Sequence, residues 1–262
     1  MSTINTIILG IIQGVTEFLP VSSSGHLVIA EHLLPNWHQP GIVFEILLHL
    51  ATLLAVVIFF RRDITMLAGA VLRPEPHTKD RRHLFFMLML ASIPTGIVGF
   101  FGKKFFTSVF NRLDLVGLML LITALLLWLA EKRITPEKTV VDGKSALLIG
   151  TVQGLAILPG ISRSGSTIAA AMLAGIAGES AARFSFLLSI PAITGAVLLN
   201  LKEISTLPPE QLPACLDGFA AALITGLMSL KLLLLIIKKR RLSFFAGYCL
   251  IAGIATLLLA LS

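Results

Sequence analysis

The first cluster of polar residues that could do chemistry lies between residues 13 and 26. Gln13 and Glu17 are four residues apart, which places them on one face of a helix. Leu19-Pro20 ends that helix, and three serines, a glycine and His26 follow. Oxygen ligands from this group could hold a hard divalent cation beside a phosphate. Ser23 or His26 could then attack phosphorus while the other acts as acid or base; the alternative is that the serines only cap a helix.

A second cluster, at residues 159–167, places one arginine among four hydroxyl groups. The planar guanidinium of Arg163 matches phosphate oxygens, and an arginine at membrane depth needs an anion. If the two clusters meet, Arg163 faces the loop that carries Glu17 and His26. The alternative is a structural Arg163–Glu17 ion pair without a substrate. The four hydroxyl residues are Ser162, Ser164, Ser166 and Thr167.

The two clusters belong to an internal duplication. Gln13-Gly14 recurs as Gln153-Gly154, and Ser22-x-Ser24-Gly25 recurs as Ser162-x-Ser164-Gly165, both 140 positions later. We therefore expect one membrane domain over residues 1–262, with repeat 1 at about 5–130 and repeat 2 at about 146–261.

The composition requires that lipid surrounds most of this chain. Hydrophobic residues make up 56% of the 262 residues, charged residues only 13%, and the mean hydropathy is +0.92. Too few charges remain to clothe a water-soluble enzyme of this size. The net charge of +7 is then a positive-inside excess and does not indicate nucleic acid binding. Cys215 and Cys249 form neither a disulfide framework nor a metal motif.

The apolar segments predict an all-α integral membrane protein. Six segments are long enough to cross the bilayer as helices, for which about 20 residues are needed. Regions 5–34 and 146–177 are instead broken at their serine loops, which predicts two re-entrant helical hairpins. Each repeat would hold one hairpin and three spans, so the second repeat would be inverted relative to the first. The six expected spans are 41–60, 83–102, 113–130, 183–201, 216–237 and 243–261.

The basic residues predict the orientation. Fourteen Lys and Arg residues lie in loops 61–82, 131–145 and 238–242, whereas Lys103, Lys104, Arg112 and Lys202 are the four on the other side. The first side is therefore expected to be cytoplasmic, with both termini outside and the first hairpin entering from the outer face. Three further ionisable residues at membrane depth either have a functional role, or pair with one another or lie near an interface: Glu45, Glu179 and Arg183.

The two motifs resemble the undecaprenyl-diphosphate phosphatase family (BacA/UppP type). Gln13-x-x-x-Glu17 with Pro20-Val21-Ser22-Ser23-Ser24-Gly25-His26, and Pro159-Gly160-x-Ser162-Arg163-Ser164-Gly165-x-Thr167, carry the resemblance, which covers nearly the whole chain. It implies hydrolysis of undecaprenyl diphosphate to the monophosphate carrier of peptidoglycan synthesis, and an association with bacitracin resistance. It also implies a divalent cation, Mg²⁺ or Ca²⁺.

Site residues follow from the same resemblance. Glu17, Ser23, His26 and Arg163 match the catalytic residues. Gln13 stands where many members have glutamate, so Glu17 and Gln13 are the expected metal ligands. The hydroxyl groups expected to bind the substrate are those of Ser22, Ser24, Ser162, Ser164 and Thr167.

The expected partners are a polyisoprenoid diphosphate and membrane lipid in the bacterial cytoplasmic (inner) membrane, with the active site toward the outer face. Nucleic acid is not expected, and a homodimer is left open. Two rival functions remain. A polyisoprenoid-phosphate flippase or transporter would share the inverted repeats. An intramembrane serine protease would share the serine loop, but it would not require Arg163 there.

Overall fold

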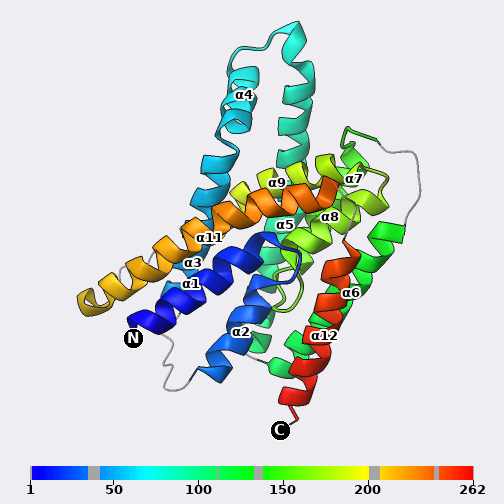
Figure 1. Ribbon diagram of the computed structural model, residues 1–262. Coiled ribbons are helices and arrows are strands. Elements are labelled where there is room, and N and C mark those ends of the chain that lie inside the picture. Colours follow the sequence, from blue (N-terminus) through cyan, green and yellow to red (C-terminus); the bar gives the residue numbers. More distant parts are fainter. Residues whose placement is uncertain are drawn as a thin grey trace.

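The computed structural model describes residues 2–34, 42–110, 112–132, 138–200, 207–238 and 242–261 (Figure 1). These residues are mostly helical and contain no strand, apart from an isolated bridge between Lys138 and Ile176. The first half contains α1 (Thr3–Phe18), α2 (Ser23–Leu33), α3 (Ile42–Phe59), α4 (Arg61–Leu72), η1 (Pro76–Thr78), α5 (Lys79–Val109) and α6 (Leu113–Lys132). The second half contains α7 (Gly143–Leu155), α8 (Arg163–Leu173), α9 (Gly178–Leu199), η2 (Pro209–Gln211), α11 (Leu212–Lys238) and α12 (Ser243–Leu259).

Four helical stretches are long and apolar enough to cross a membrane: Pro76–Gly102, Leu113–Lys132, Gly178–Leu199 and Pro209–Ile237. A fifth candidate is the pair Val43–Phe59 and Arg61–Leu72, which is bent by 72°. Helices cover nearly all described residues of the six expected segments, but α12, at 17 residues, is shorter than a full span. The chain is therefore a multi-pass helical membrane protein, and its described residues contain four to five candidate spans.

Several sequence expectations fall outside the described residues. These are positions 41 and 201 at the ends of two expected spans, and five of the basic residues that define the charge bias, namely Arg133, Lys202, Lys239, Arg240 and Arg241.

The two serine loops separate two pairs of short helices, as their prolines predict. Residues 19–22 lie between α1 and α2, and residues 156–162 lie between α7 and α8. The Oγ of Ser22 accepts a hydrogen bond from the Gly25 amide (3.3 Å), and the Oγ of Ser162 accepts one from the Gly165 amide (3.1 Å). Each serine thus caps the helix that follows it. In Figure 1 both loops lie near the centre of the bundle.

Helices of the two halves pack across each other. α1 lies along α11, α7 lies along α5, and α6 lies along α12. Glycine permits the closest approaches: a Cβ on Gly10 would clash with the carbonyl of Gly218, and one on Gly150 would clash with the backbone of Ala91. Small residues at such interfaces let membrane helices come near enough for extensive van der Waals contact. This crossed packing brings the two serine loops together.

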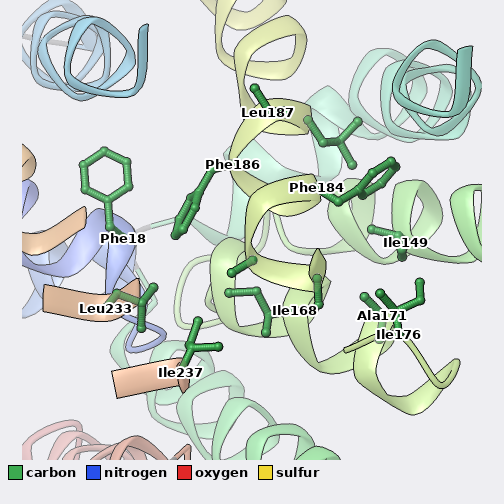
Figure 2. Packing of buried hydrophobic residues seen from close by; sticks show 14 of the residues in the cluster. Phe18, Ile149, Ile168, Ala171, Ile176, Phe184, Phe186, Leu187, Leu233 and Ile237 are labelled. Atoms are coloured by element: carbon green, nitrogen blue, oxygen red, sulfur yellow. The ribbon is translucent and has the colours of Figure 1, made fainter. Parts of the chain in front are cut away.

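The main hydrophobic core lies beside the loops, around α8 and α9 (Figure 2). Phe184 and Phe186 of α9 are almost fully buried there, and Ile168 of α8 has no exposed surface. Phe18, the last residue of α1, meets Phe186 edge to face with ring centroids 5.9 Å apart. The core therefore anchors the end of α1 and, with it, the neighbouring Glu17.

Candidate active site

The carboxylate of Glu17 is the centre of the polar cluster. It is 6% exposed and lies in the last turn of α1. Its Oε2 accepts hydrogen bonds from the Ser23 hydroxyl (2.5 Å) and from the Gln13 amide nitrogen (3.0 Å). Its Oε1 accepts one from Nη2 of Arg163, with which it forms a buried ion pair. The structure thus brings together four residues expected from the sequence.

Ser23 and Arg163 reach Glu17 from equivalent positions. Each is the first residue of its helix, α2 or α8, and directly follows a capping serine. Two contacts hold the loops together: the Gly160 amide donates to the Ser22 Oγ (3.1 Å), and the Ser164 hydroxyl donates to the Leu19 carbonyl (3.4 Å). The hydroxyl and the guanidinium are therefore held on one carboxylate by the packing of both halves.

Thr123 supports the second loop and was not expected from the sequence. Its hydroxyl donates to the Gly160 carbonyl (3.0 Å) and accepts from the Ser162 amide (3.0 Å). Thr123 belongs to α6, is completely buried, and lies in an otherwise apolar segment. A single polar residue in an apolar segment could have suggested a buried hydrogen bond, although the sequence does not reveal that its partner is the second loop.

Two buried polar atoms of the cluster have no protein partner among the described residues. They are Nη1 of Arg163 and Oε1 of Gln13. Buried polar groups are normally hydrogen-bonded, because leaving one unpaired costs about 1–3 kcal/mol. The guanidinium therefore has a donor left for an anion, and the Gln13 amide has an acceptor left for a cation or a donor.

The donor set is compatible with a divalent cation next to phosphate. Gln13 supplies an unpaired oxygen, and Glu17 supplies a carboxylate whose oxygens can accept more bonds than the three recorded here. The described residues contain no group of three or more His, Cys, Asp or Glu side chains that could hold a metal ion. Two protein oxygens suit a cation that keeps several waters and phosphate oxygens as ligands, as Mg²⁺ commonly does.

His49 of α3 is a further member of the cluster that the sequence analysis missed. Its Nε2 lies 3.9 Å from Oε2 of Glu17, and its Nδ1 is 2.8 Å from the Glu45 carbonyl. The available signal was its position one helical turn after Glu45, a residue already noted as ionisable at membrane depth.

His26 lies one turn into α2 and is held by other groups. Its Nδ1 is 2.7 Å from the Ser22 carbonyl, and its Nε2 is 2.7 Å from the hydroxyl of Tyr248 on α12. Its recorded contacts include none with Glu17, Ser23 or Arg163. Tyr248 was not expected at the site, because nothing in the local sequence links it to a histidine 222 positions away.

The hydroxyl groups expected to bind the substrate lie in two settings. Those of Ser24 and Ser164 are within 3.5 Å and 3.3 Å of the capping hydroxyls of Ser22 and Ser162. Thr167 is fully buried, and its hydroxyl contacts the Arg163 carbonyl (2.8 Å) and the Ser185 hydroxyl (2.6 Å). The structure therefore places four of the five at the loops and Thr167 in a hydrogen-bonded position inside the bundle.

Other charged groups lie apart from this cluster. Arg183 pairs with Asp63 of α4. Arg183 also lines a cavity of about 360 Å³ together with Lys79, Asp80 and His83. None of the cavity's lining residues belongs to the Glu17 cluster.

Comparisons with known proteins identify a family and several relatives. Residues 6–255 match the family described as bacitracin resistance protein BacA. The chain is 44% identical over 255 residues to an undecaprenyl-diphosphatase of Syntrophotalea carbinolica, covering 97% of both chains. It is 41% identical to one of Methanosphaera stadtmanae and 42% identical to one of Halothermothrix orenii, covering 99% of each chain in both cases.

Proposed function

Because this chain belongs to the BacA family, we propose that it is an undecaprenyl-diphosphatase that carries out its reaction at the Glu17 cluster. It hydrolyses undecaprenyl diphosphate to undecaprenyl phosphate and inorganic phosphate, which recycles the lipid carrier for peptidoglycan synthesis. The observation that carries the site assignment is the meeting of the Ser23 hydroxyl and the Arg163 guanidinium on one buried carboxylate. The names of the relatives do not favour the rival flippase or protease.

In this proposal Ser23 is the nucleophile and Glu17 is its base. The Ser23 hydroxyl already donates to Oε2 of Glu17 at 2.5 Å, so its proton can pass to the carboxylate as Oγ attacks the terminal phosphorus. The Oγ–P bond forms, the bridging P–O bond breaks, and undecaprenyl phosphate leaves. A water molecule then attacks the phosphoserine: its oxygen bonds to phosphorus, the Oγ–P bond breaks, and inorganic phosphate leaves while Oγ takes back the proton held by Glu17. His26 acts as the base that accepts the proton of that water.

Arg163 binds the phosphoryl group that is transferred. Its Nη2 remains on Glu17, and its unpaired Nη1 is the donor for a phosphate oxygen. Charge builds up on these oxygens as the bridging bond breaks, and a fixed guanidinium in a water-poor site stabilises that charge strongly. The hydroxyls of Ser24 and Ser164 contribute further hydrogen bonds at the same loops.

Gln13 and Glu17 would hold the divalent cation through their oxygens. The unpaired Oε1 of Gln13 supports this assignment. When bound, Mg²⁺ or Ca²⁺ would supply positive charge against the diphosphate oxygens.

The proposed layout consists of two inverted repeats, each with one re-entrant hairpin and three spans. The crossed packing of α1 on α11 and of α7 on α5 supports it, because each half then completes the other's bundle. A polar site reached at membrane depth suits this substrate, since the isoprenoid tail stays in lipid while the diphosphate meets Arg163.

The test of the function is phosphate release by the purified full-length protein in detergent. We expect release from undecaprenyl diphosphate, loss of release when a chelator is added, and recovery with Mg²⁺ or Ca²⁺. The Ser23→Ala protein, purified in the same way, controls for contaminating phosphatases. Equal release by Ser23→Ala and the unaltered protein would contradict the proposed site, and no release by either would contradict the function.

Sidedness is a separate part of the proposal: the bacterial inner membrane, with both termini and the diphosphate site on the outer face. Cys215 and Cys249 are completely buried, so a new Ser24→Cys thiol can be labelled against a quiet background. A membrane-impermeant thiol reagent should label position 24 in intact cells, and bound substrate should protect this position from labelling. Thr139→Cys, in the expected cytoplasmic loop, is the matched control and should react only in inverted vesicles. The reverse pattern would overturn the orientation.

A further inference from the structure

Tyr248 makes a contact with His26 that joins the two halves of the molecule. Its hydroxyl is 2.7 Å from Nε2 of His26, and the two ring planes differ by only 13° with centroids 5.6 Å apart. Tyr248 is the single tyrosine of the sequence. A phenol at membrane depth requires a hydrogen-bond partner, and here that partner is an imidazole next to the serine loop.

The hydrogen bonds of His26 determine which ring nitrogen is basic. The Ser22 carbonyl, 2.7 Å from Nδ1, can only accept, so Nδ1 carries a proton. In the neutral imidazole Nε2 then holds the lone pair, and the Tyr248 hydroxyl donates to it. Because the hydroxyl occupies the one in-plane position at Nε2, a proton from water reaches Nε2 through it: the hydroxyl gives its own proton to Nε2 and takes the proton of the water. In the resulting imidazolium, the hydroxyl accepts a hydrogen bond from Nε2. Tyr248 can therefore hold the ring in both protonation states.

The position of Tyr248 is fixed by its neighbours on α12. Cys249, the next residue, is completely buried and contacts the Pro20 carbonyl in the first loop. Phe245 and Ala246 are buried in the main core, one turn earlier. α12 is thus locked against the loop, although Tyr248 itself is 44% exposed.

We propose that Tyr248 is a positioning residue for His26: its hydroxyl keeps the imidazole in one orientation, with Nε2 as the nitrogen that receives, through that hydroxyl, the proton released during hydrolysis. The proposal rests on the role of His26 in the proposed function. Because Tyr248 acts through His26, its hydroxyl affects turnover and not the binding of the diphosphate.

Tyr248→Phe removes only the hydroxyl. We expect kcat to fall about tenfold, the worth of one hydrogen bond of about 1.4 kcal/mol, while KM changes less than about twofold. In a His26→Gln background the same change should cost nothing further, because the partner is already gone. Phe244→Leu, on the same helix at a 72% exposed position, is the matched control and should leave kcat unchanged.

The single tyrosine also permits a spectroscopic test of the contact. Growth on fluorotyrosine labels Tyr248 alone, so the protein should give one ¹⁹F resonance. That resonance should shift as His26 titrates, and the shift should disappear in His26→Gln. Other titratable groups on α2, on the helices packed against it and on α12 are held constant by this comparison; they include Glu31 and His32 on α2, Glu17 on α1, Asp114 on α6 and Cys249 on α12.

The outcomes separate this inference from the proposed function. If His26→Gln is impaired and Tyr248→Phe is fully active, Tyr248 is not a positioning residue, and the phosphatase mechanism stands. Equal losses from Tyr248→Phe with and without His26 would mean that Tyr248 acts on packing, which also overturns the inference. A fully active His26→Gln protein would remove His26 from the mechanism and Tyr248 with it, whereas phosphate release by the unaltered protein would still support the function. If Tyr248→Phe fails to fold, the fluorotyrosine protein decides: a ¹⁹F resonance that does not shift as His26 titrates overturns the inference.

Discussion

The loops at residues 19–22 and 156–162 share the same helix–loop–helix arrangement, but their side chains carry different chemistry. In both, a serine caps the following helix through the amide three residues later. In both, the first helical residue contacts Glu17, but that residue is Ser23 in the first loop and Arg163 in the second. Four residues after Gln153, the counterpart of Gln13, the second half has Ile157 and no carboxylate. One carboxylate therefore serves both halves, with the reacting hydroxyl on one side and the cation on the other.

The backbones of the two loops differ as well. Ser22 has a φ of 73° and is the one non-glycine residue with positive φ in the described part of the chain, whereas Ser162 has a φ of −73°. The second loop instead places its positive φ, 95°, on Gly160, where no side chain resists it. A strained non-glycine residue costs about 1–3 kcal/mol and persists only when its surroundings hold it. Here the Gly160 amide holds Ser22, so the relaxed loop supports the strained, reactive one.

Among the substitutions in the two loops, Ser23→Ala should reduce activity most. It removes the proposed nucleophile, and we expect kcat to fall by roughly 10³-fold or more, as for other enzymes that lose a nucleophilic serine. Ser24→Ala, whose recorded side-chain contact is a 3.5 Å approach to Ser22, should lose much less. Single-turnover phosphate release measures both. Similar rates for the two variants would mean that Ser23 is not the nucleophile.

Glu17→Gln tests whether one carboxylate serves both loops. We expect a loss of roughly 10²- to 10³-fold, because the base for Ser23 is gone, and excess divalent metal should restore little. The change also leaves the Arg163 charge unpaired, so thermal unfolding in detergent must be measured beside kcat. Gln13→Glu is the paired variant and should stay active with a lower metal requirement. An active Glu17→Gln protein with an unchanged metal requirement would place the metal elsewhere.

Arg163→Lys tests whether the second loop binds the transition state through the planar geometry of the guanidinium or through its positive charge alone. A lysine keeps the charge but cannot contact Glu17 and a phosphate oxygen at once through a planar fork. We expect kcat/KM to fall by about 10²-fold, equivalent to about 3 kcal/mol of transition-state binding, with the thermal midpoint nearly unchanged. Near-normal turnover would make Arg163 a structural partner of Glu17, the alternative that the sequence had left open.

The sequence predicted the two helix–loop–helix motifs better than it predicted the contacts between helices. The duplicated serine motifs and prolines indicated where the helices break, and the spacing of Gln13 and Glu17 placed both on one face. His49 and Tyr248 were missed, because their contacts depend on how α3 and α12 are rotated about their own axes. Membrane helices are apolar toward lipid and toward the core alike, so hydropathy does not set that rotation. The expected end of a span at residue 60 coincides with the 72° bend, but the helix Arg61–Leu72 was missed, because residues 61–82 were expected to form a loop.

Ser22→Ala and Ser162→Ala should separate the strained loop from the relaxed one by stability. The Ser22 hydroxyl accepts from two backbone amides, those of Gly25 and Gly160, whereas the Ser162 hydroxyl accepts from the Gly165 amide alone. Leaving an amide unpaired costs about 1 kcal/mol or more, so Ser22→Ala should lower the free energy of unfolding by about 2 kcal/mol and Ser162→Ala by about half of that. Thermal unfolding in detergent compares them. An equal loss would mean that the contact between the loops adds no stability.

The smallest expected difference between the two hairpins is in stability, and it lies where their first helices, α1 and α7, begin. Asp142 caps α7, where its carboxylate accepts from the Ser145 amide at 2.8 Å, but Ser2 makes no side-chain cap for α1. The bond from the Ser145 amide lowers the pKa of Asp142, and Lys138 and Lys144 add to this effect. Asp142→Ala should therefore cost about 0.5–1 kcal/mol, the lower part of the range for caps because the side chain is exposed, and should leave kcat unchanged.

The pH dependence of that difference has a definite sign. A carboxylate whose pKa is lower in the folded state stabilises the fold above its unfolded pKa of about 4 and loses that effect as the pH falls through the folded value. The gap in thermal midpoint between the unaltered protein and Asp142→Ala should thus be full at pH 7 and should shrink on acidification below pH about 4. Ser2→Ala, the matched control, should show no gap at either pH. A gap for Asp142→Ala that is independent of pH would mean that the carboxylate's charge has no part in capping α7.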